Sequence, residues 1–301
     1  MAKAPPSVPC RQTIATTVPV FFDEEGTPIV IAAIGSVPAA MVVDTGAEGT
    51  IISRQLAVQL GMTGFFKEIT YPFMRIGGIG GSTAAFVEPA PPITLGNAQA
   101  KNMKIYVLTK DTGQVALGTK SAVDGIMGND IWFWNNLYLD FPDGKLLLVD
   151  RQSCLRPAPN WPGKIIQVPF SAEILGYIVL PVAVDGHALM AILDTGAAVS
   201  TLPGSLLSAA GLKPENAIPL RVIQLVGAGG VISADLDRFK IITIGDQSFL
   251  NPVFAVPQIG VPDYQGLGVA NPYGDMIIGE DFIRRHRIFI SYATHTLYIQ
   301  E

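Results

Sequence analysis

Short apolar segments alternate with glycine- and proline-containing turns along most of the chain, which is the pattern of strands joined in hairpins. Residues 181–193 are mostly apolar except for a central Asp185-Gly186. Asp-Gly between two apolar runs favours a two-residue type I′ turn, so this stretch predicts a β-hairpin. Residues 28–43 have the same layout around Gly35-Ser36 and predict an equivalent hairpin in the first half of the chain.

Helix signals are few and short. The segments 53–60 and 205–210 each run into a glycine, the residue type that most often follows the last turn of a helix. A second short helix is predicted in each half, after Gly128 and after Gly279. The remainder is strand and turn, so the sequence predicts an all-β chain.

The chain contains an internal repeat with a period near 150 residues. Five blocks recur in the same order, at offsets that differ by two residues at most: 41–47 with 191–197, Gly61 with Gly211, 77–81 with 226–230, 93–97 with 242–246, and 126–131 with 277–282. Such a period is too long for a solenoid, and it indicates two copies of one domain. We therefore predict an N-terminal lobe over 1–150, a proline-containing linker over 151–164 and a C-terminal lobe over 165–301.

Composition narrows the classes of function. Of 301 residues, 49% are hydrophobic and 15% charged, so the chain has ample material for packed cores. The net charge of −5 and the lack of any Lys/Arg run argue against a nucleic-acid partner. No apolar run reaches about 18 residues, so no membrane span is predicted. With three histidines and two cysteines in the whole chain, we expect no metal site and no cofactor.

Two aspartates stand at the ends of apolar runs, where a charged carboxylate is costly to bury. Asp44 and Asp194 each follow apolar residues and each begin Asp-Thr-Gly-Ala. A third Asp-Thr-Gly, at 111–113, follows Lys110 and has no counterpart in the second copy, so it is predicted to be an ordinary turn. Two pseudo-symmetric copies can bring Asp44 and Asp194 together between the lobes. Like charges that close share one proton, and such a pair can hold and activate a water molecule.

These motifs resemble those of the aspartic peptidase superfamily. The resemblance spans 18–150 and 168–299 and rests on the two Asp-Thr-Gly-Ala blocks, the matched glycine clusters, and the later Ile126-Met127-Gly128 and Ile277-Ile278-Gly279. It implies two pseudo-symmetric closed-barrel lobes with the active site between them. It also implies Asp44 and Asp194 as the catalytic pair, with catalytic-loop support from four neighbours: Thr45, Gly46, Thr195 and Gly196.

The resemblance further implies flaps, mobile hairpins that close over the substrate. The glycine clusters at 77–81 and 227–230 stand in that position, 33 residues after Asp44 and after Asp194 at their first glycines. The predicted substrate-binding residues of the flaps and walls are Ala47, Gly78, Ile79, Gly80, Ala197, Gly227, Ala228 and Gly229. The alternative is that both clusters are plain surface turns.

Two branches of the superfamily remain open. Retropepsins have one lobe per chain and act as dimers, whereas pepsins carry two lobes in one chain. The alanines at 47 and 197 and the presence of a glycine cluster in both copies favour a fused retropepsin-like pair. The two-lobe length and the segment 282–285, Phe-Ile-Arg-Arg, are pepsin-like.

The predicted function is that of an aspartic endopeptidase, which hydrolyses an extended peptide or protein substrate. Because both aspartates belong to one chain, we expect a monomer. A catalytically weak relative that binds peptides or acts as a scaffold is the first alternative, and a structural β-barrel protein is the second; the latter leaves two buried aspartates unexplained.

Localisation depends on the two cysteines. A disulfide between Cys10 and Cys154 would tie the N-terminal arm to the linker and indicate an oxidising compartment. On that reading we expect a periplasmic or secreted protein whose leader is absent from this chain. If the thiols are unpaired, a cytoplasmic location is the alternative.

Overall fold

The structure is a computed structural model that describes residues 13–62, 73–109, 122–152, 161–172, 175–216, 218–227, 229–257 and 274–300. Several sequence-based predictions fall outside these residues and stay predictions: the turn at 111–113, the disulfide between Cys10 and Cys154, and the flap position of Ala228.

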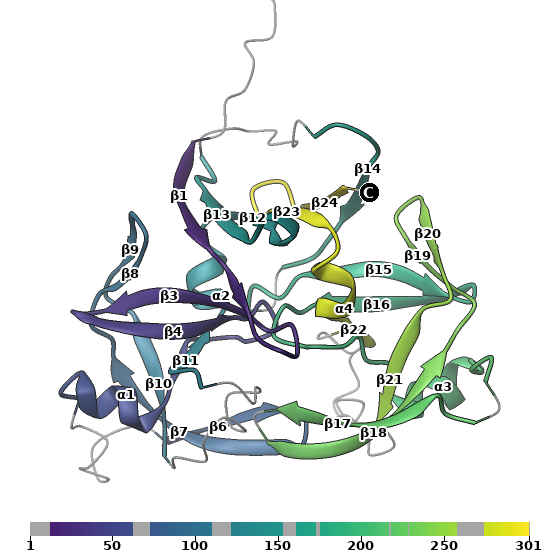
Figure 1. The fold of residues 1–301 in the computed structure, drawn as a ribbon, viewed down its shortest axis with the longest axis horizontal. Helices are drawn as coiled ribbons and strands as arrows, with labels where there is room; N and C mark the ends of the chain where they lie inside the picture. Colours follow the sequence, from purple (N-terminus) through teal and green to yellow (C-terminus); the bar gives the residue numbers. More distant parts are fainter. Residues whose placement is uncertain are drawn as a thin grey trace, which may run out of the picture.

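The first lobe is built on one large sheet with the strand order β6-β7-β10-β5-β11-β4-β3-β8-β9, and β2 pairs with β3 (Figure 1). Its strands are β2 (Phe21–Phe22), β3 (Pro28–Ile34), β4 (Val37–Val43), β5 (Ile51–Ile52), β6 (Phe73–Gly78), β7 (Gly81–Pro89), β8 (Ile93–Leu95), β9 (Ala98–Ala100), β10 (Lys104–Leu108) and β11 (Gly125–Met127). Its helices are α1 (Arg54–Gln59), α2 (Asn129–Trp132) and the 3-10 turn η3 (Phe141–Asp143).

The second lobe repeats this plan in two smaller sheets, ordered β20-β19-β15-β16-β22 and β17-β18-β21. Its strands are β15 (Val179–Val184), β16 (His187–Leu193), β17 (Arg221–Gly227), β18 (Gly230–Arg238), β19 (Ile241–Ile244), β20 (Gln247–Leu250), β21 (Val253–Pro257) and β22 (Met276–Ile278). Its helices are α3 (Gly204–Ala210) and α4 (Glu280–Ile283).

The predicted local elements are present. Strands β15 and β16 form the expected hairpin, and both turn residues, Asp185 and Gly186, have positive φ (47° and 84°), as a type I′ turn requires. Helix α1 begins after Ser53, whose side chain accepts a hydrogen bond from the Leu56 N–H. Helix α3 ends at Gly211 with φ of 68°, the left-handed conformation that favours glycine.

The mostly β, two-lobed fold is therefore confirmed. Closure of each lobe into a barrel is not: within the described residues the strand pairings form open sheets. Barrel closure and the domain boundaries stay predictions. No helix in the described part of the chain has the length and apolar character needed to cross a bilayer.

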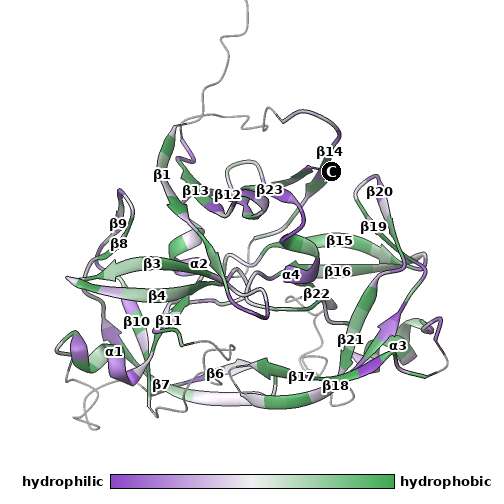
Figure 2. Ribbon diagram, in the orientation of Figure 1, coloured by the Kyte–Doolittle hydropathy of each residue, from purple (hydrophilic) through white to green (hydrophobic). Residues whose placement is uncertain are grey.

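A six-stranded sheet joins the two lobes. Its order is β1 (Ile14–Pro19), β13 (Lys145–Val149), β12 (Asn136–Asp140), β23 (Arg287–Ser291), β24 (Thr296–Gln300) and β14 (Ile165–Pro169). The central antiparallel pair, β12 with β23, crosses from one lobe to the other. The hydrophobic core is continuous with this sheet and runs through both lobes, and Figure 2 shows the hairpins beneath it, β3–β4 and β15–β16, as largely hydrophobic.

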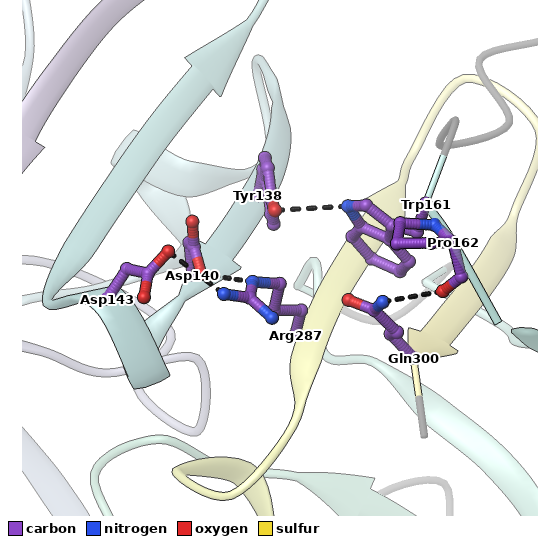
Figure 3. Close-up of polar contacts among 7 residues, drawn as sticks. All are labelled: Tyr138, Asp140, Asp143, Trp161, Pro162, Arg287 and Gln300. Atoms are coloured by element: carbon purple, nitrogen blue, oxygen red, sulfur yellow. Dashed lines mark hydrogen bonds and ion pairs between the residues drawn. The ribbon is translucent and has the colours of Figure 1, made fainter.

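Polar contacts reinforce this bridging sheet (Figure 3). The Arg287 guanidinium of the second lobe donates to Asp140 of the first lobe at 2.8 Å and to Asp143 at 2.9 Å. The Trp161 indole donates to the Tyr138 hydroxyl at 3.0 Å. The bridging sheet and these contacts hold the lobes in one relative orientation, so the loops that face each other beneath it meet in a defined geometry.

Candidate active site

The two Asp-Thr-Gly segments lie at equivalent strand ends, one in each lobe. Asp44 follows β4, and its N–H donates to Met127 of the parallel strand β11 at 3.1 Å. Asp194 follows β16, and its N–H donates to Ile278 of the parallel strand β22 at 2.9 Å. These neighbours are the two apolar blocks that the sequence repeat had paired, and they fix the direction in which each loop leaves its sheet.

The structure brings the Asp44 and Asp194 carboxyl groups together. Each accepts a hydrogen bond of 2.8 Å from the N–H two residues on, that of Gly46 or Gly196. Each also lies directly against the glycine of the opposite loop: a Cβ on Gly46 would overlap the Asp194 carboxyl, and one on Gly196 would overlap the Asp44 carboxyl. Both glycines are therefore required by close approach rather than by backbone angle.

Burial and proximity act on the protonation of this pair. Burial raises the pKa of Asp44 well above its ordinary value, and the adjacent Asp194 charge raises it further, against the lowering effect of the Gly46 N–H. Burial likewise raises the pKa of Asp194, while hydrogen bonds from Gly196 and Asp44 lower it. The raised pKa values mean that the pair retains one proton above the pH at which isolated aspartates have lost theirs.

Thr45 and Thr195 lock the two loops together, and both are fully buried. The Thr45 N–H donates to the Thr195 hydroxyl at 3.0 Å, and the Thr195 N–H donates to the Thr45 hydroxyl at 3.1 Å. The Thr45 hydroxyl donates to the Leu193 carbonyl at 2.7 Å, and the Thr195 hydroxyl donates to the Val43 carbonyl at 2.6 Å. Four hydrogen bonds thus connect the lobes directly beneath the carboxyl pair.

Removing either hydroxyl should weaken this connection measurably. Thr195→Val keeps the side-chain shape but leaves the Thr45 N–H and the Val43 carbonyl buried without their partner. We expect a loss of about 2–5 kcal/mol in the free energy of unfolding, measured by urea denaturation. Thr195→Ser, which keeps the hydroxyl, is the control and should lose much less. Equal losses in the two variants would contradict a role for the hydroxyl bonds.

A second pair of carboxylates, partly buried and missed by the sequence reasoning, supports the same loops. Asp130 accepts from the Thr50 N–H at 2.9 Å and from its hydroxyl at 2.7 Å. Asp281 accepts from the Ser200 N–H at 2.8 Å and from its hydroxyl at 2.7 Å. The recurrence of Asp130 and Asp281 at the repeat offset was the available signal.

A cavity of about 240 Å³ lies over the carboxyl pair. Of the predicted residues, nine line it: Asp44, Gly46, Ala47, Gly78, Ile79, Asp194, Gly196, Ala197 and Gly227. Thr45 and Thr195 lie buried below it, and Gly80 and Gly229 lie at the hairpin tips outside its lining.

The sequence reasoning missed other wall residues, among them Glu48, Arg75, Tyr106 and Tyr177. Glu48 directly follows Ala47 and could have been found by adjacency. Tyr106 comes from β10, and a Cβ on Gly49 would overlap its ring, so only the folded chain shows that it faces this site.

The two glycine-rich hairpins meet over the cavity. β6–β7 and β17–β18 lie end to end on the side of the molecule away from the bridging sheet (Figure 1). Their tips touch through the backbone: the Gly229 N–H donates to the Ile79 carbonyl at 3.1 Å. A Cβ on Gly80 would lie 2.7 Å from the Gly230 carbonyl carbon, closer than real contacts allow. The plain surface-turn alternative does not account for this contact between lobes.

Comparison with known proteins agrees with this geometry. A model of the family described as aspartyl protease matches residues 30–131 and 180–282, one match in each lobe. These matches cover more than half of the chain, and the chain therefore belongs to the aspartyl protease family. It is similar in fold to the crystal structure of the aspartic proteinase from Irpex lacteus, with a TM-score of 0.55 and 15% sequence identity over 95% of this chain and 96% of that chain. A search of curated protein sequences gives no significant match.

Proposed function

We propose that this protein is an aspartic endopeptidase in which Asp44 and Asp194 are the catalytic pair. The observation that carries the proposal is the meeting of these two carboxyl groups at the floor of a cavity roofed by two hairpins. Membership of the aspartyl protease family and the two-lobed fold support a protease-like function.

The chemistry follows from one shared proton. A water molecule held between the carboxyl groups loses a proton to the ionised aspartate as it attacks the peptide carbonyl carbon. The protonated aspartate donates its hydrogen bond to the carbonyl oxygen, where negative charge develops. The raised pKa values of Asp44 and Asp194 suit this division of roles, because two carboxyl groups at such close range share one proton.

The substrate is proposed to be an extended peptide segment of a polypeptide, held between the carboxyl pair and the hairpins. Such a segment can form main-chain hydrogen bonds with the hairpin strands, while its side chains enter pockets along the cavity. The walls near the carboxyl pair are mostly apolar, with Ile51, Ile76, Ile79, Ile126 and Val226. Among the described lining residues, only Glu48 and Arg75 carry charge besides Asp44 and Asp194.

The direct test is hydrolysis of a fluorogenic peptide library between pH 3 and pH 7, with and without pepstatin, an aspartic-peptidase inhibitor. We expect cleavage that pepstatin abolishes. Peptide binding without cleavage would instead support the catalytically weak peptide-binding or scaffold alternative, and cleavage that pepstatin leaves untouched would place the activity at another site.

The protein is further proposed to act as a monomer, because one chain supplies both aspartates. Specific activity should therefore stay constant on dilution from micromolar to nanomolar protein, measured at saturating substrate. A steep fall on dilution, together with a larger species in analytical ultracentrifugation at high concentration, would show that a second chain is needed.

Substitution at the hairpin tips tests whether both hairpins act as flaps. Gly80→Val and Gly229→Val each place a side chain against the backbone of the opposing tip, at Gly230 and Gly81. We expect each to lower kcat/KM about tenfold or more by holding the hairpins apart, with little change in Tm because the tips bury little core. Gly77→Ala is the control, since its added methyl meets nothing within 4 Å.

The pattern of effects also separates the two branches of the superfamily. Loss of activity in both variants supports two functional flaps, the fused retropepsin-like arrangement. Loss in Gly80→Val alone supports one flap and a pepsin-like arrangement. Activity equal to that of Gly77→Ala in both variants would contradict a flap role altogether.

A further inference from the structure

The two lobes differ at one buried position beside the catalytic loops. Helices α2 and α4 are equivalent, and their first residues are Asn129 and Glu280. The preceding glycines have nearly the same backbone angles, φ −100° and ψ −169° at Gly128 and φ −103° and ψ −168° at Gly279. The Asn129 N–H donates to the Ala47 carbonyl at 2.9 Å, and the Glu280 N–H donates to the Ala197 carbonyl at 2.8 Å. The two side chains therefore start from the same place in their lobes.

In the first lobe, this side chain holds the catalytic loop. The Asn129 amide Nδ2 donates to the Thr45 carbonyl at 3.0 Å, and Asn129 is only 1% exposed. The carbonyl of the residue after the catalytic aspartate is thus satisfied by a neutral donor that cannot titrate.

Among the described residues of the second lobe, neither corresponding group has a hydrogen-bond partner. Glu280 is also 1% exposed, and neither of its carboxyl oxygens accepts a hydrogen bond from any described residue. Thr195 is fully buried, and within the described part of the chain no hydrogen bond to its carbonyl oxygen is found. A buried carbonyl without a donor and a buried carboxylate without a donor are each costly. A protonated Glu280 that donates to Thr195 would give this carbonyl a donor and would remove the buried charge.

Electrostatics favour the protonated form. Burial raises the pKa of Glu280 well above its ordinary value. Arg284, which directly follows the last residue of α4, lowers this pKa, whereas the negative charges of Asp194 in the facing loop and Asp281 in α4 raise it. Arg284 is exposed, and it makes no ion pair with Glu280 among the described contacts. An ionised Glu280 would be a buried charge without a direct partner.

We propose that Glu280 is a positioning residue that acts as a neutral carboxylic acid, donates a hydrogen bond to the Thr195 carbonyl, and limits activity at high pH. When it ionises, the second catalytic loop loses its donor, and a negative charge appears beside Asp194. Both changes disturb the Asp44 and Asp194 pair, which must carry a single negative charge. The effect on activity rests on the proposed peptidase function, whereas the neutral state of Glu280 does not.

Two nearly isosteric substitutions test the effect on activity in opposite directions. Glu280→Gln keeps a donor for Thr195 but cannot ionise. Asn129→Asp gives the first lobe a titrating acid in place of its amide. The measurement is kcat/KM against pH, with each profile normalised to its own maximum. Two pH units above the wild-type optimum, the normalised kcat/KM of Glu280→Gln should be about tenfold higher than that of the wild type, and that of Asn129→Asp should be lower. If the normalised kcat/KM of the wild type and of Glu280→Gln fall at the same pH on the alkaline side, Glu280 does not limit activity at high pH.

The protonation state is tested without any assay of activity. The infrared difference spectrum of the wild type minus Glu280→Gln at neutral pH should contain the carbonyl stretch of a protonated carboxylic acid. The free energy of unfolding should agree: because the folded protein keeps a proton that the unfolded chain releases, stability falls as pH rises above the ordinary Glu range towards the raised pKa, and this slope is smaller in Glu280→Gln.

The outcomes distinguish the two hypotheses. The difference spectrum could contain a carboxylate band alone, with the same slope of unfolding free energy against pH in the wild type and Glu280→Gln. This result would overturn the proposal that Glu280 is a neutral acid, even if the enzyme is active. A protonated-acid band in a protein that cleaves no peptide would uphold the neutral Glu280 and refute the peptidase function and, with it, the pH limit. If Glu280→Gln does not fold, two measurements still test the proposal. They are the pH titration of the wild-type infrared spectrum and the pH profile of kcat/KM in Asn129→Asp.

Discussion

Replacing either Asp44 or Asp194 with asparagine should lower kcat by about three orders of magnitude or more. Each variant removes one of two functions that the proposed mechanism requires together, the base that takes a proton from water or the acid that donates to the carbonyl oxygen. An asparagine keeps the shape and still offers an oxygen to the Gly46 or Gly196 N–H, bonds that the aspartates accept at 2.8 Å. The fold should therefore persist, which circular dichroism and Tm can confirm.

The control for this pair is Asp246→Asn, which neutralises an aspartate whose side chain is 72% exposed on the second lobe. It should keep wild-type activity. If either Asp44→Asn or Asp194→Asn retains more than about a tenth of wild-type kcat/KM, the assignment of the catalytic pair is wrong.

Adding a single methyl group to Gly46 or to Gly196 should also abolish most activity. In Gly46→Ala the new Cβ overlaps the Asp194 carboxyl, and in Gly196→Ala it overlaps that of Asp44. Either the carboxyl group or the opposite loop must move, and displacement of a reacting group by about 1 Å commonly costs a hundredfold in rate. We expect a fall of about a hundredfold or more in kcat, with about 1–3 kcal/mol lost from the free energy of unfolding through overpacking.

Gly77→Ala again serves as the matched control, because Gly77 lines the same cavity and its added methyl is free of contacts within 4 Å. Activity in Gly46→Ala or Gly196→Ala that equals activity in this control would show that the carboxyl groups lie farther from the opposite loop than the structure has them. The size of the effect should be similar in the two variants, since the overlap is reciprocal.

The pseudo-symmetry has limits that matter for function. The lobes share the aspartates, the threonine bonds and the Asp130 and Asp281 supports, so the floor of the site is nearly two-fold symmetric. Glu48 and Glu280 break the symmetry, because their counterparts in the repeat are Ala198 and Asn129. An extended peptide has a direction, and a site with unlike halves can bind it in a preferred one.

The amino-acid sequence by itself determined the local elements and the duplication. Hairpins β3–β4 and β15–β16, the helix starts and stops at Ser53 and Gly211, and the 150-residue offset between Asp44 and Asp194 could all be predicted. Turn conformation, capping and strand alternation depend on residues a few positions apart, so their physical causes lie within short stretches of the chain. The repeat then predicted that two aspartates would meet, since equivalent loops of two equal lobes face a common axis.

Only the tertiary structure decided how the lobes are joined and what surrounds the carboxyl pair of Asp44 and Asp194. The pairing of β12 with β23, the backbone contact between the hairpin tips, and the approach of Tyr106 to Gly49 each bring together residues far apart in sequence. The same holds for Glu280, which looks like an ordinary charged residue at a helix start until the fold removes it from water next to the loop that carries Asp194. Desolvation and hydrogen-bond satisfaction are properties of the packed interior, and a linear pattern does not contain them.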